Sequence, residues 1–597
     1  MIHYADEYQT EDYTKTINEL KQDFHFPRIR SYDFVIVGGG TAGCLLAGRL
    51  SEYFSVLLIE SGGEPIPATY NHYFRVEIEY HPSFNTKFMS TPQKNFSMET
   101  EGRIDNWLGR MLGGSGSHNG NIYNRGSRHD YDTLAKLTGD DSWSYQNVLK
   151  HFKNIENYVG HLENEEQRQE LYGTSGPLTI DTDNSFIGPA WFQAAAELNY
   201  DIIDPNGNQT EGFSEAPISM KNGERDSTYT AYIKPVEGNR KSLTVMKYST
   251  VDKVLVDGNG VAYGVSYKRH GIPQIAHANK DVIISSGSYS SPVILIKSGI
   301  GPEDGLKEAE IPIVSHVPGV GKNLRDHCAV SLAFTAFSPN TTLMPRLYEE
   351  ELEDELMKYL DPNTRHGYFT VFDKPQAFLV SPVAKSEGEE DWPDLQVVYT
   401  LWNVSAVVER HETTREFKLS VILNRHKSVG ELVFDTDAYL DGKREANDLV
   451  LVDYRLFSED TDVDRQIYGI KVALQLMEDT APFQQMDVRY TEKTPEACVN
   501  ITYRSDDYWR CYIQQRAMNY YHPSGTCKMG PDTDAMSVVD ASFRVRGVKN
   551  LRVVDASILP LPTNANLNAA VILLAEKAAS DILTEYGIDE LSSSNDQ

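Results

Sequence analysis

The sequence predicts an α/β fold, and three observations near its start support this prediction. Phe34–Val37 is a short apolar run, typical of a strand that is buried on both faces. Ala42–Leu50 has helical periodicity, with its leucines on one side. Val56–Ile59 is a second apolar run, and Glu60 follows at its end. A strand, a helix and a second strand in this order are typical of a parallel sheet covered by helices.

A glycine-rich turn joins the first strand to the helix. Its glycines have the G-x-G-x-x-G spacing, which lets the backbone approach a pyrophosphate at the helix N-terminus, while an acid after the second strand accepts a ribose hydroxyl. A glycine turn in another α/β fold is the alternative, but the placement between a buried strand and a helix favours a dinucleotide. The loop alone does not distinguish NAD from FAD. The predicted site comprises Gly38, Gly40, Thr41, Ala42, Gly43 and Glu60.

Length and composition set limits on the function. A chain of 597 residues is too long for one hydrophobic core, which predicts two or more domains. The net charge of -30 argues against nucleic acid and anionic membranes as partners. No apolar run approaches the roughly 20 residues that span a bilayer. The opening MIHYADEYQTEDY resembles neither a signal peptide nor a transit peptide, but a mature N-terminus would look the same, so secretion stays open.

The five cysteines include no C-x-x-C pair, so we expect no metal site. Cys498 and Cys511 flank a polar, turn-like segment. They either form a local disulfide, which would imply an oxidising compartment, or remain two free thiols. Sequons that permit glycosylation without showing it occur at Asn95, Asn208, Asn340, Asn403 and Asn500.

A second glycine-rich segment, LGRMLGGSGSHNGNIYNRGSRHDYD, begins at Leu108. Small residues, hydrogen-bond donors and one imidazole share this loop, so a flat ring and a pyrophosphate can lie close to its backbone. The segment resembles the first signature of the glucose-methanol-choline (GMC) oxidoreductases, which are FAD-dependent alcohol oxidases and dehydrogenases. The matching residues are Gly109, Arg110, Leu112, Gly113, Gly114, Ser115, Asn119, Tyr123 and Asp132.

Two later segments extend the resemblance. DVIISSGSYSSPVILIKSGIG fits the second GMC signature, and VPGVGKNLRDH matches the segment that follows it in the family. The resemblance implies a Rossmann-like FAD-binding domain, interleaved with an α+β substrate domain built on an antiparallel sheet with helices. A lead-in (1–30) and a polar tail (591–597) flank an FAD-binding domain of residues 31–135, 240–327 and 548–590 and a substrate domain of residues 136–239 and 328–547.

His118 departs from the usual family pattern, which has an aliphatic residue there. A histidine at this position resembles the choline-oxidase branch, where it carries the flavin through a covalent bond to the 8α-methyl. The alternative is a noncovalent flavin with His118 hydrogen-bonded beside it. The resemblance also implies that Val251 touches the adenine. Further FAD contacts are implied for Arg110, Gly113, Gly114, Asn119, Asp555, Ala556 and Asn568.

The segments YYHPSGTCKMG and LPTNANLNAA hold the reactive groups. Oxidation of an alcohol removes a hydroxyl proton and a hydride from the same carbon. A histidine can take the proton at neutral pH, and flavin N5 accepts the hydride. By resemblance, His522 is the base and Asn566 is its partner on the alcohol oxygen. His327 lies beside a turn, and we interpret it as structural rather than catalytic.

The predicted function is oxidation of a small alcohol, which includes aromatic alcohols and cyanohydrins, with O2 as the acceptor and H2O2 as the product. A quinone acceptor is one alternative, and a hydroxynitrile lyase with non-redox FAD is another. A binding protein that has lost catalysis is disfavoured because His522 and Asn566 are both present. The segment SDDYWRCYIQQ is similar to arthropod GMC proteins, which implies a Cys498–Cys511 disulfide and an extracellular location. The oligomeric state is not indicated.

Overall fold

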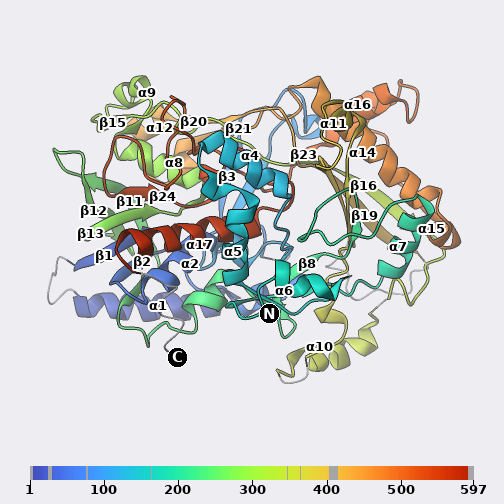
Figure 1. Ribbon diagram of the computed structural model, residues 1–597, viewed down its shortest axis with the longest axis horizontal. Helices are drawn as coiled ribbons and strands as arrows, with labels where there is room; N and C mark the ends of the chain where they lie inside the picture. Colours follow the sequence, from blue (N-terminus) through green and yellow to red (C-terminus); the bar gives the residue numbers. More distant parts are fainter. Residues whose placement is uncertain are drawn as a thin grey trace.

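The predicted strand–helix–strand unit lies at the centre of the first sheet (Figure 1). The computed structural model describes residues 5–23, 30–75, 78–162, 164–345, 347–362, 365–401 and 414–588. Five strands of the first sheet run parallel and two are antiparallel, which confirms the α/β prediction. In sheet order they are β10 (Leu243–Met246), β2 (Val56–Ile59), β1 (Arg30–Val37), β13 (Ile272–Ile284), β12 (Ala262–Arg269) and β11 (Ser249–Val256), with β24 (Leu551–Val553) beside β13.

The carboxyl ends of the parallel strands bring distant parts of the chain to one edge. The apolar residues of β1 and β2 are almost fully buried, because α2 (Thr41–Leu50) and α17 (Asn568–Glu585) pack together over this sheet (Figure 1). Gly38 follows β1, Glu60 follows β2 and Ser285 follows β13. In open α/β sheets, ligands bind outside these strand ends, so the fold places the predicted nucleotide residues together.

The second sheet is antiparallel and lies on the opposite side of Figure 1 from the first. Two of its strands, β18 (Leu395–Leu401) and β19 (Arg415–Leu423), pair along their length, and residues 402–413 between them lie outside the described residues. One face packs against the long helix α14 (Asp460–Glu478). In order the strands are β22 (Val488–Tyr490), β16 (Cys328–Ala336), β19 (Arg415–Leu423), β18 (Leu395–Leu401), β17 (Gln376–Leu379) and β7 (Gly212–Ser214), with β23 (Met518–Asn519) beside β16.

Two four-stranded sheets and one two-stranded sheet complete the strand architecture of the described residues. One has the order β20 (Glu431–Phe434), β21 (Val450–Asp453), β3 (Asn85–Ser90) and β4 (Asp105–Gly109). The other has the order β5 (Glu156–Tyr158), β6 (Leu178–Thr182), β8 (Pro217–Lys221) and β9 (Glu224–Arg225), and β14 (Ile300–Gly301) pairs with β15 (Ser315–His316).

Helices cover the sheets and begin near the strand ends. The segment of the second GMC signature forms α8 (Gly287–Lys297) after β13, and α5 (Tyr145–Ile155) precedes β5. Other helices of eight or more residues are α4 (Arg128–Thr138), α7 (Gly188–Glu197), α10 (Leu352–Leu360) and α16 (Asp506–Arg516). Shorter ones are α3 (His72–Arg75), α6 (Arg168–Leu171), α9 (Glu303–Glu308), α11 (Pro382–Ser386), α12 (Thr436–Leu440), α13 (Ala446–Leu449) and α15 (Ala481–Gln485).

The N-terminal lead-in forms a long helix. This helix, α1 (Ala5–Asp23), has 19 residues and is bound to the first sheet by ion pairs. Lys247 pairs with Asp12 at 2.5 Å and with Glu64 at 2.6 Å. Because Lys247 and Asp12 are largely buried, this pairing fixes the helix against the first sheet.

The predicted Cys498–Cys511 disulfide is present, with 5.9 Å between the two Cα atoms. It ties the middle of α16 to the short helical turn Glu496–Cys498. Among the helices that the structure describes, none has both the length and the apolar character that crossing a bilayer requires. The described residues also contain no cluster of three or more metal-binding side chains.

Candidate active site

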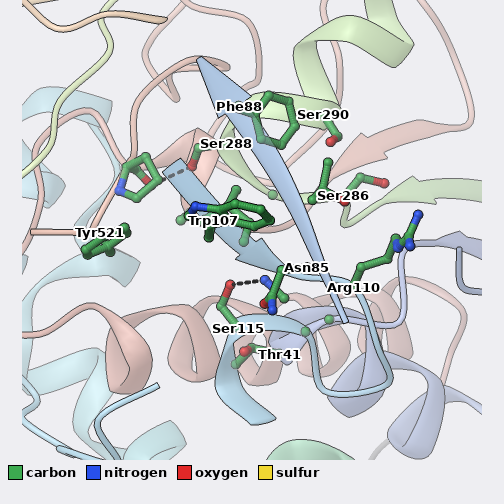
Figure 2. Close-up of a pocket in the computed structure, with 18 of the residues that line it drawn as sticks. Thr41, Asn85, Phe88, Trp107, Arg110, Ser115, Ser286, Ser288, Ser290 and Tyr521 are labelled. Atoms are coloured by element: carbon green, nitrogen blue, oxygen red, sulfur yellow. Dashed lines mark hydrogen bonds between the residues drawn. The ribbon is translucent and has the colours of Figure 1, made fainter. Parts of the chain in front are cut away.

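A cavity of about 1080 Å³ lies between the strand ends of the first sheet and one face of the second. Figure 2 shows Thr41, Ser115, Trp107 and Tyr521 around it. Most of the residues predicted for cofactor and catalysis line this one space: Gly38, Gly40, Thr41, Ala42, Glu60, Arg110, Gly114, His118, Asn119, Val251, His522, Asp555, Ala556, Asn566 and Asn568. Gly43 and Gly113 were predicted with them but do not line the cavity.

The first glycine loop is shaped by close backbone approaches. Gly38 has φ of 101°, and a Cβ there would lie 2.5 Å from the Ser285 carbonyl oxygen. A Cβ on Gly43 would lie 1.9 Å from the Gly38 carbonyl oxygen, so this glycine lets α2 pack against the loop instead of facing the cavity. No side chain caps the α2 N-terminus at Gly40. Its backbone N–H groups therefore suit a phosphate.

Glu60 is held at the end of β2 by two backbone donors. Its Oε2 accepts from the Gly39 N–H and its Oε1 from the Gly62 N–H, both at 2.8 Å. Burial raises the pKa of Glu60, while these N–H groups act against that shift. Each carboxylate oxygen retains acceptor capacity, so the group can also receive a ribose hydroxyl at the cavity wall.

The second glycine-rich loop folds back on β4 and carries His118. Gly113 and Gly114 have positive φ, at 82° and 53°, which explains their identity. A Cβ on Gly109 would lie 2.6 Å from the His118 ring, so the imidazole rests directly on the β4 backbone. The hydroxyl of Ser115 accepts from the Gly109 N–H at 3.1 Å, drawn dashed in Figure 2. The loop thus presents a fixed imidazole to the cavity.

A buried arginine fixes the far end of the same loop. Arg225 donates from Nη1 to Asn119 Oδ1 and from Nη2 to the Asn119 carbonyl, both at 2.6 Å. Its Nε donates to the Thr69 carbonyl at 2.9 Å. These bonds give Asn119 one orientation at the cavity wall.

Asp555 organises the opposite wall. Its Oδ2 accepts from the Gly287 N–H at 2.9 Å and from the Ser291 hydroxyl at 2.6 Å, and its Oδ1 accepts from the Ser557 N–H at 2.8 Å. The carboxylate therefore joins the start of α8 to the turn after β24. Asn568 lies at the first residue of α17, so a second helix N-terminus, with its partial positive charge, also faces the cavity.

His522 and Asn566 meet at the cavity wall. Asn566 Nδ2 lies 3.4 Å from His522 Nε2, and His522 Nδ1 lies 2.8 Å from Nδ1 of His327. His327 is fully buried, and its carbonyl accepts from the Tyr520 N–H at 2.8 Å. The sequence interpretation of His327 as structural missed that it contacts the predicted base.

The loop that carries His522 is strained and tightly fixed. Tyr521 has φ of 59°, which is uncommon for a bulky residue. Asp326 Oδ1 accepts from the His522 N–H at 2.7 Å, and burial raises the pKa of Asp326 to about 7. Burial also lowers the pKa of His522 to about 3. The His522 ring is therefore neutral at pH 7 and able to accept a proton.

The comparisons with known proteins agree with this geometry. Two GMC oxidoreductase family models match residues 32–329 and 438–575. The chain is 32% identical over 576 residues to the glucose dehydrogenase (FAD, quinone) of Drosophila pseudoobscura pseudoobscura, covering 93% of this chain and 87% of the relative. It is 31% identical to oxygen-dependent choline dehydrogenase 1 of Chromohalobacter salexigens, covering 93% and 95%. The chain belongs to the GMC oxidoreductases.

A solved relative supports the family fold over nearly the whole chain. The pyridoxine 4-oxidase from Mesorbium loti superposes with a TM-score of 0.75 at 25% identity, covering 92% of this chain and 98% of that one. The cofactor of this GMC oxidoreductase is FAD. The residues present fit it: an uncapped helix start and glycine cradle for the pyrophosphate, Glu60 for a ribose, and two further helix starts at the cavity wall.

The wall opposite the nucleotide end is polar, and sequence reasoning did not identify it. Val398, Thr400, Lys418 and Ser420 of β18 and β19 line the cavity of this GMC enzyme. The signal was present in the strand LQVVYTL, where Gln396 and Thr400 alternate with larger apolar residues. Period-2 alternation shows that one face is polar, but it does not show that this face meets a cavity rather than solvent.

Proposed function

We propose that this GMC enzyme oxidises a small alcohol, with His522 as the base and Asn566 as the group that holds the alcohol oxygen. The supporting observation is the 3.4 Å contact between Asn566 Nδ2 and His522 Nε2 in the cavity that the FAD-binding loops line. A hydroxyl oxygen that replaces this contact can accept from the amide while its proton points at the imidazole. The same oxygen then accepts the amide hydrogen bond and gives its proton to the imidazole, as the reaction requires.

The chain's own groups account for the proton. Burial lowers the pKa of His522, so the ring is neutral at pH 7 and its Nε2 lone pair is free to face the hydroxyl proton. The Asn566 amide donates to the oxygen as it gains negative charge, which favours the transition state over the bound alcohol. Bound FAD supplies the hydride acceptor.

The proposed electron acceptor is O2, which takes two electrons and two protons to give H2O2. A quinone is the second candidate, because one relative is named a glucose dehydrogenase (FAD, quinone). A panel of alcohols, aromatic alcohols and cyanohydrins tests both candidate electron acceptors, O2 and a quinone. We expect anaerobic bleaching of the flavin by at least one alcohol and peroxide when air is admitted. Bleaching without peroxide, with turnover on addition of a quinone, would favour the dehydrogenase.

The same panel tests the hydroxynitrile lyase alternative. A cyanohydrin that gives aldehyde and cyanide under nitrogen, while the flavin stays oxidised, would overturn the proposed oxidation. The matched control is His522→Ala, which keeps the cavity but removes the proposed base, so neither bleaching nor cleavage should exceed background.

We propose further that His118 carries the flavin covalently. Its ring packs against the Gly109 backbone and lines the same cavity as the residues proposed to hold FAD. Acid precipitation tests this: the yellow colour should pellet with wild type and stay in solution with His118→Ala. Colour released from wild type would show that the link is absent.

An extracellular, glycosylated enzyme completes the proposal. The Cys498–Cys511 disulfide supports an oxidising compartment, because such bonds are rare in reducing ones. Four of the sequon asparagines lie in described residues, and Asn403 lies outside them. Expression in a secreting eukaryotic host followed by glycosidase treatment should lower the apparent mass, and an unchanged mass would argue against glycosylation.

A further inference from the structure

Three buried side-chain amides form a hydrogen-bond network that reaches the Asn566 side chain. Asn124, Gln376 and Gln396 are each fully buried. Gln396 Nε2 donates to Asn566 Oδ1 at 3.3 Å, and Asn124 Nδ2 donates to the same oxygen at 3.5 Å. Two donors therefore converge on the Asn566 carbonyl, and its Nδ2 is left to face His522.

A backbone carbonyl determines which atoms of these amides donate and which accept. Gln376 Nε2 donates to the Glu215 carbonyl at 3.4 Å, and a carbonyl can only accept. Gln376 Oε1 must then be the acceptor for Gln396 Nε2 at 2.8 Å and for Asn124 Nδ2 at 2.9 Å. Asn124 Oδ1 in turn accepts from Gln376 Nε2 at 3.1 Å. Reversing any one amide would bring two oxygens or two N–H groups together.

The same donor–acceptor order fixes which nitrogen of the His522 imidazole carries the hydrogen. Because Asn566 offers an N–H to His522 Nε2, that nitrogen has to be the unprotonated one in the neutral ring. Nδ1 then carries the hydrogen and donates it to His327 Nδ1 at 2.8 Å. The other tautomer would place two N–H groups opposite each other at 3.4 Å.

We propose that Gln396, with Asn124 and Gln376, is a positioning residue that selects the Nδ1–H tautomer of His522 by fixing the Asn566 amide. This rests on the proposed role of His522 as base. A reversed Asn566 amide would turn its oxygen towards Nε2 and favour a proton there. Nε2 would then hold a hydrogen before any substrate arrived, and the atom that has to accept the hydroxyl proton would be occupied.

The test replaces Gln396 by Met, which keeps the length of the side chain and removes its donor. The matched control is Gln466→Met on α14. Gln466 is also fully buried and donates from Nε2 to the Val421 carbonyl at 2.9 Å, but on the opposite face of the sheet. Both variants lose one buried amide donor, so a merely structural effect should appear in both.

The decisive readout is the nitrogen NMR spectrum of the FAD-loaded protein, labelled with 15N-histidine. In wild type and Gln466→Met, the His522 signals, assigned by their loss in His522→Ala, should show a protonated Nδ1 and an unprotonated Nε2. In Gln396→Met, they should shift towards the mixed or Nε2–H form. A wild-type spectrum in Gln396→Met would overturn the proposal, and so would an Nε2–H tautomer in wild type.

Kinetics supply a second readout. Gln396→Met removes one neutral hydrogen bond to Asn566. The rate of flavin reduction should therefore fall about tenfold, with little change in substrate affinity. Asn124→Leu removes the other donor to Asn566 and serves if Gln396→Met does not fold; it should shift the same signals. Failure of the proposed function is distinguishable, because His522→Ala would then reduce its flavin normally whatever the tautomer.

Discussion

The contact between His327 and His522 leads to a prediction whose size can be worked out. When His522 Nε2 accepts a proton, its ring becomes positive and the Nδ1–H bond to His327 changes from neutral to charge-assisted. Neutral hydrogen bonds contribute about 0.5–1.5 kcal/mol and charge-assisted ones about 1.5–3 kcal/mol. The difference, about 1–1.5 kcal/mol, favours the transition state, and about 1.4 kcal/mol corresponds to a tenfold rate.

The perturbation is His327→Leu, assayed by anaerobic stopped-flow reduction of the flavin with the best alcohol of the panel. We expect reduction to slow about tenfold at saturating alcohol, while the half-saturating concentration changes little, because the lost interaction grows only as charge develops. His327→Asn should recover most of the rate, since its Oδ1 can accept in place of the ring Nδ1.

The control is His151→Leu, which removes another buried imidazole, on α5. Both leucine variants lose a similar buried group, so general destabilisation would slow reduction in both. Reduction by His327→Leu within twofold of wild type would refute the reasoning. A matching slowdown in His151→Leu would refute it as well.

Three further predictions follow from the cavity and the disulfide. Gly43→Ala places a methyl group 1.9 Å from the Gly38 carbonyl oxygen, and such overpacking costs about 1–3 kcal/mol. FAD retention, measured as flavin absorbance per protein, should therefore fall roughly tenfold. The control Gly305→Ala, which has open space around the added methyl group, should retain FAD. Burial lowers the pKa of His522 to about 3, so its unprotonated form persists above that pH. The rate of flavin reduction should therefore be constant from pH 8 to pH 5. A decrease in this rate centred near pH 6.5, the ordinary histidine pKa, would contradict the prediction. Cys511→Ser removes the disulfide that joins residues 13 positions apart and should lower the free energy of unfolding by about 3 kcal/mol. Denaturant titration measures this change, with reduced wild type as the reference.

Local pattern was enough to predict which residues gather at the carboxyl ends of the first sheet. The β1–α2–β2 unit, α8 and the α17 start each depend on apolar periodicity and glycine placement within some 20 residues. The carboxyl ends of parallel strands then meet by topology alone, so Gly38, Glu60 and Asp555 share one edge. The length of α1 was not predicted, because its charged partner Lys247 lies 235 positions away.

The substrate half could be predicted only by resemblance. His327 and His522 are 195 positions apart, and Asn124 and Asn566 are 442 apart. No periodicity links residues at such separations; the register of β17, β18 and β19 brings the amides together. A buried Gln in an apolar strand such as LQVVYTL is the one local signal, because an amide removed from water requires a partner.

The chemical character of these partners explains why the proposed base, His522, is uncharged at neutral pH. A carboxylate on His522 Nδ1 would stabilise the imidazolium and raise the pKa of the ring, so that it would hold a proton before the alcohol bound. Instead the Nδ1 partner is His327, whose own pKa is held well below the usual value by burial and by the neighbouring ring. Asp326, the nearby carboxyl, accepts from the His522 backbone rather than from its ring. Neutral amides and a neutral imidazole therefore orient the base without charging it, and the positive charge forms only when the substrate proton arrives.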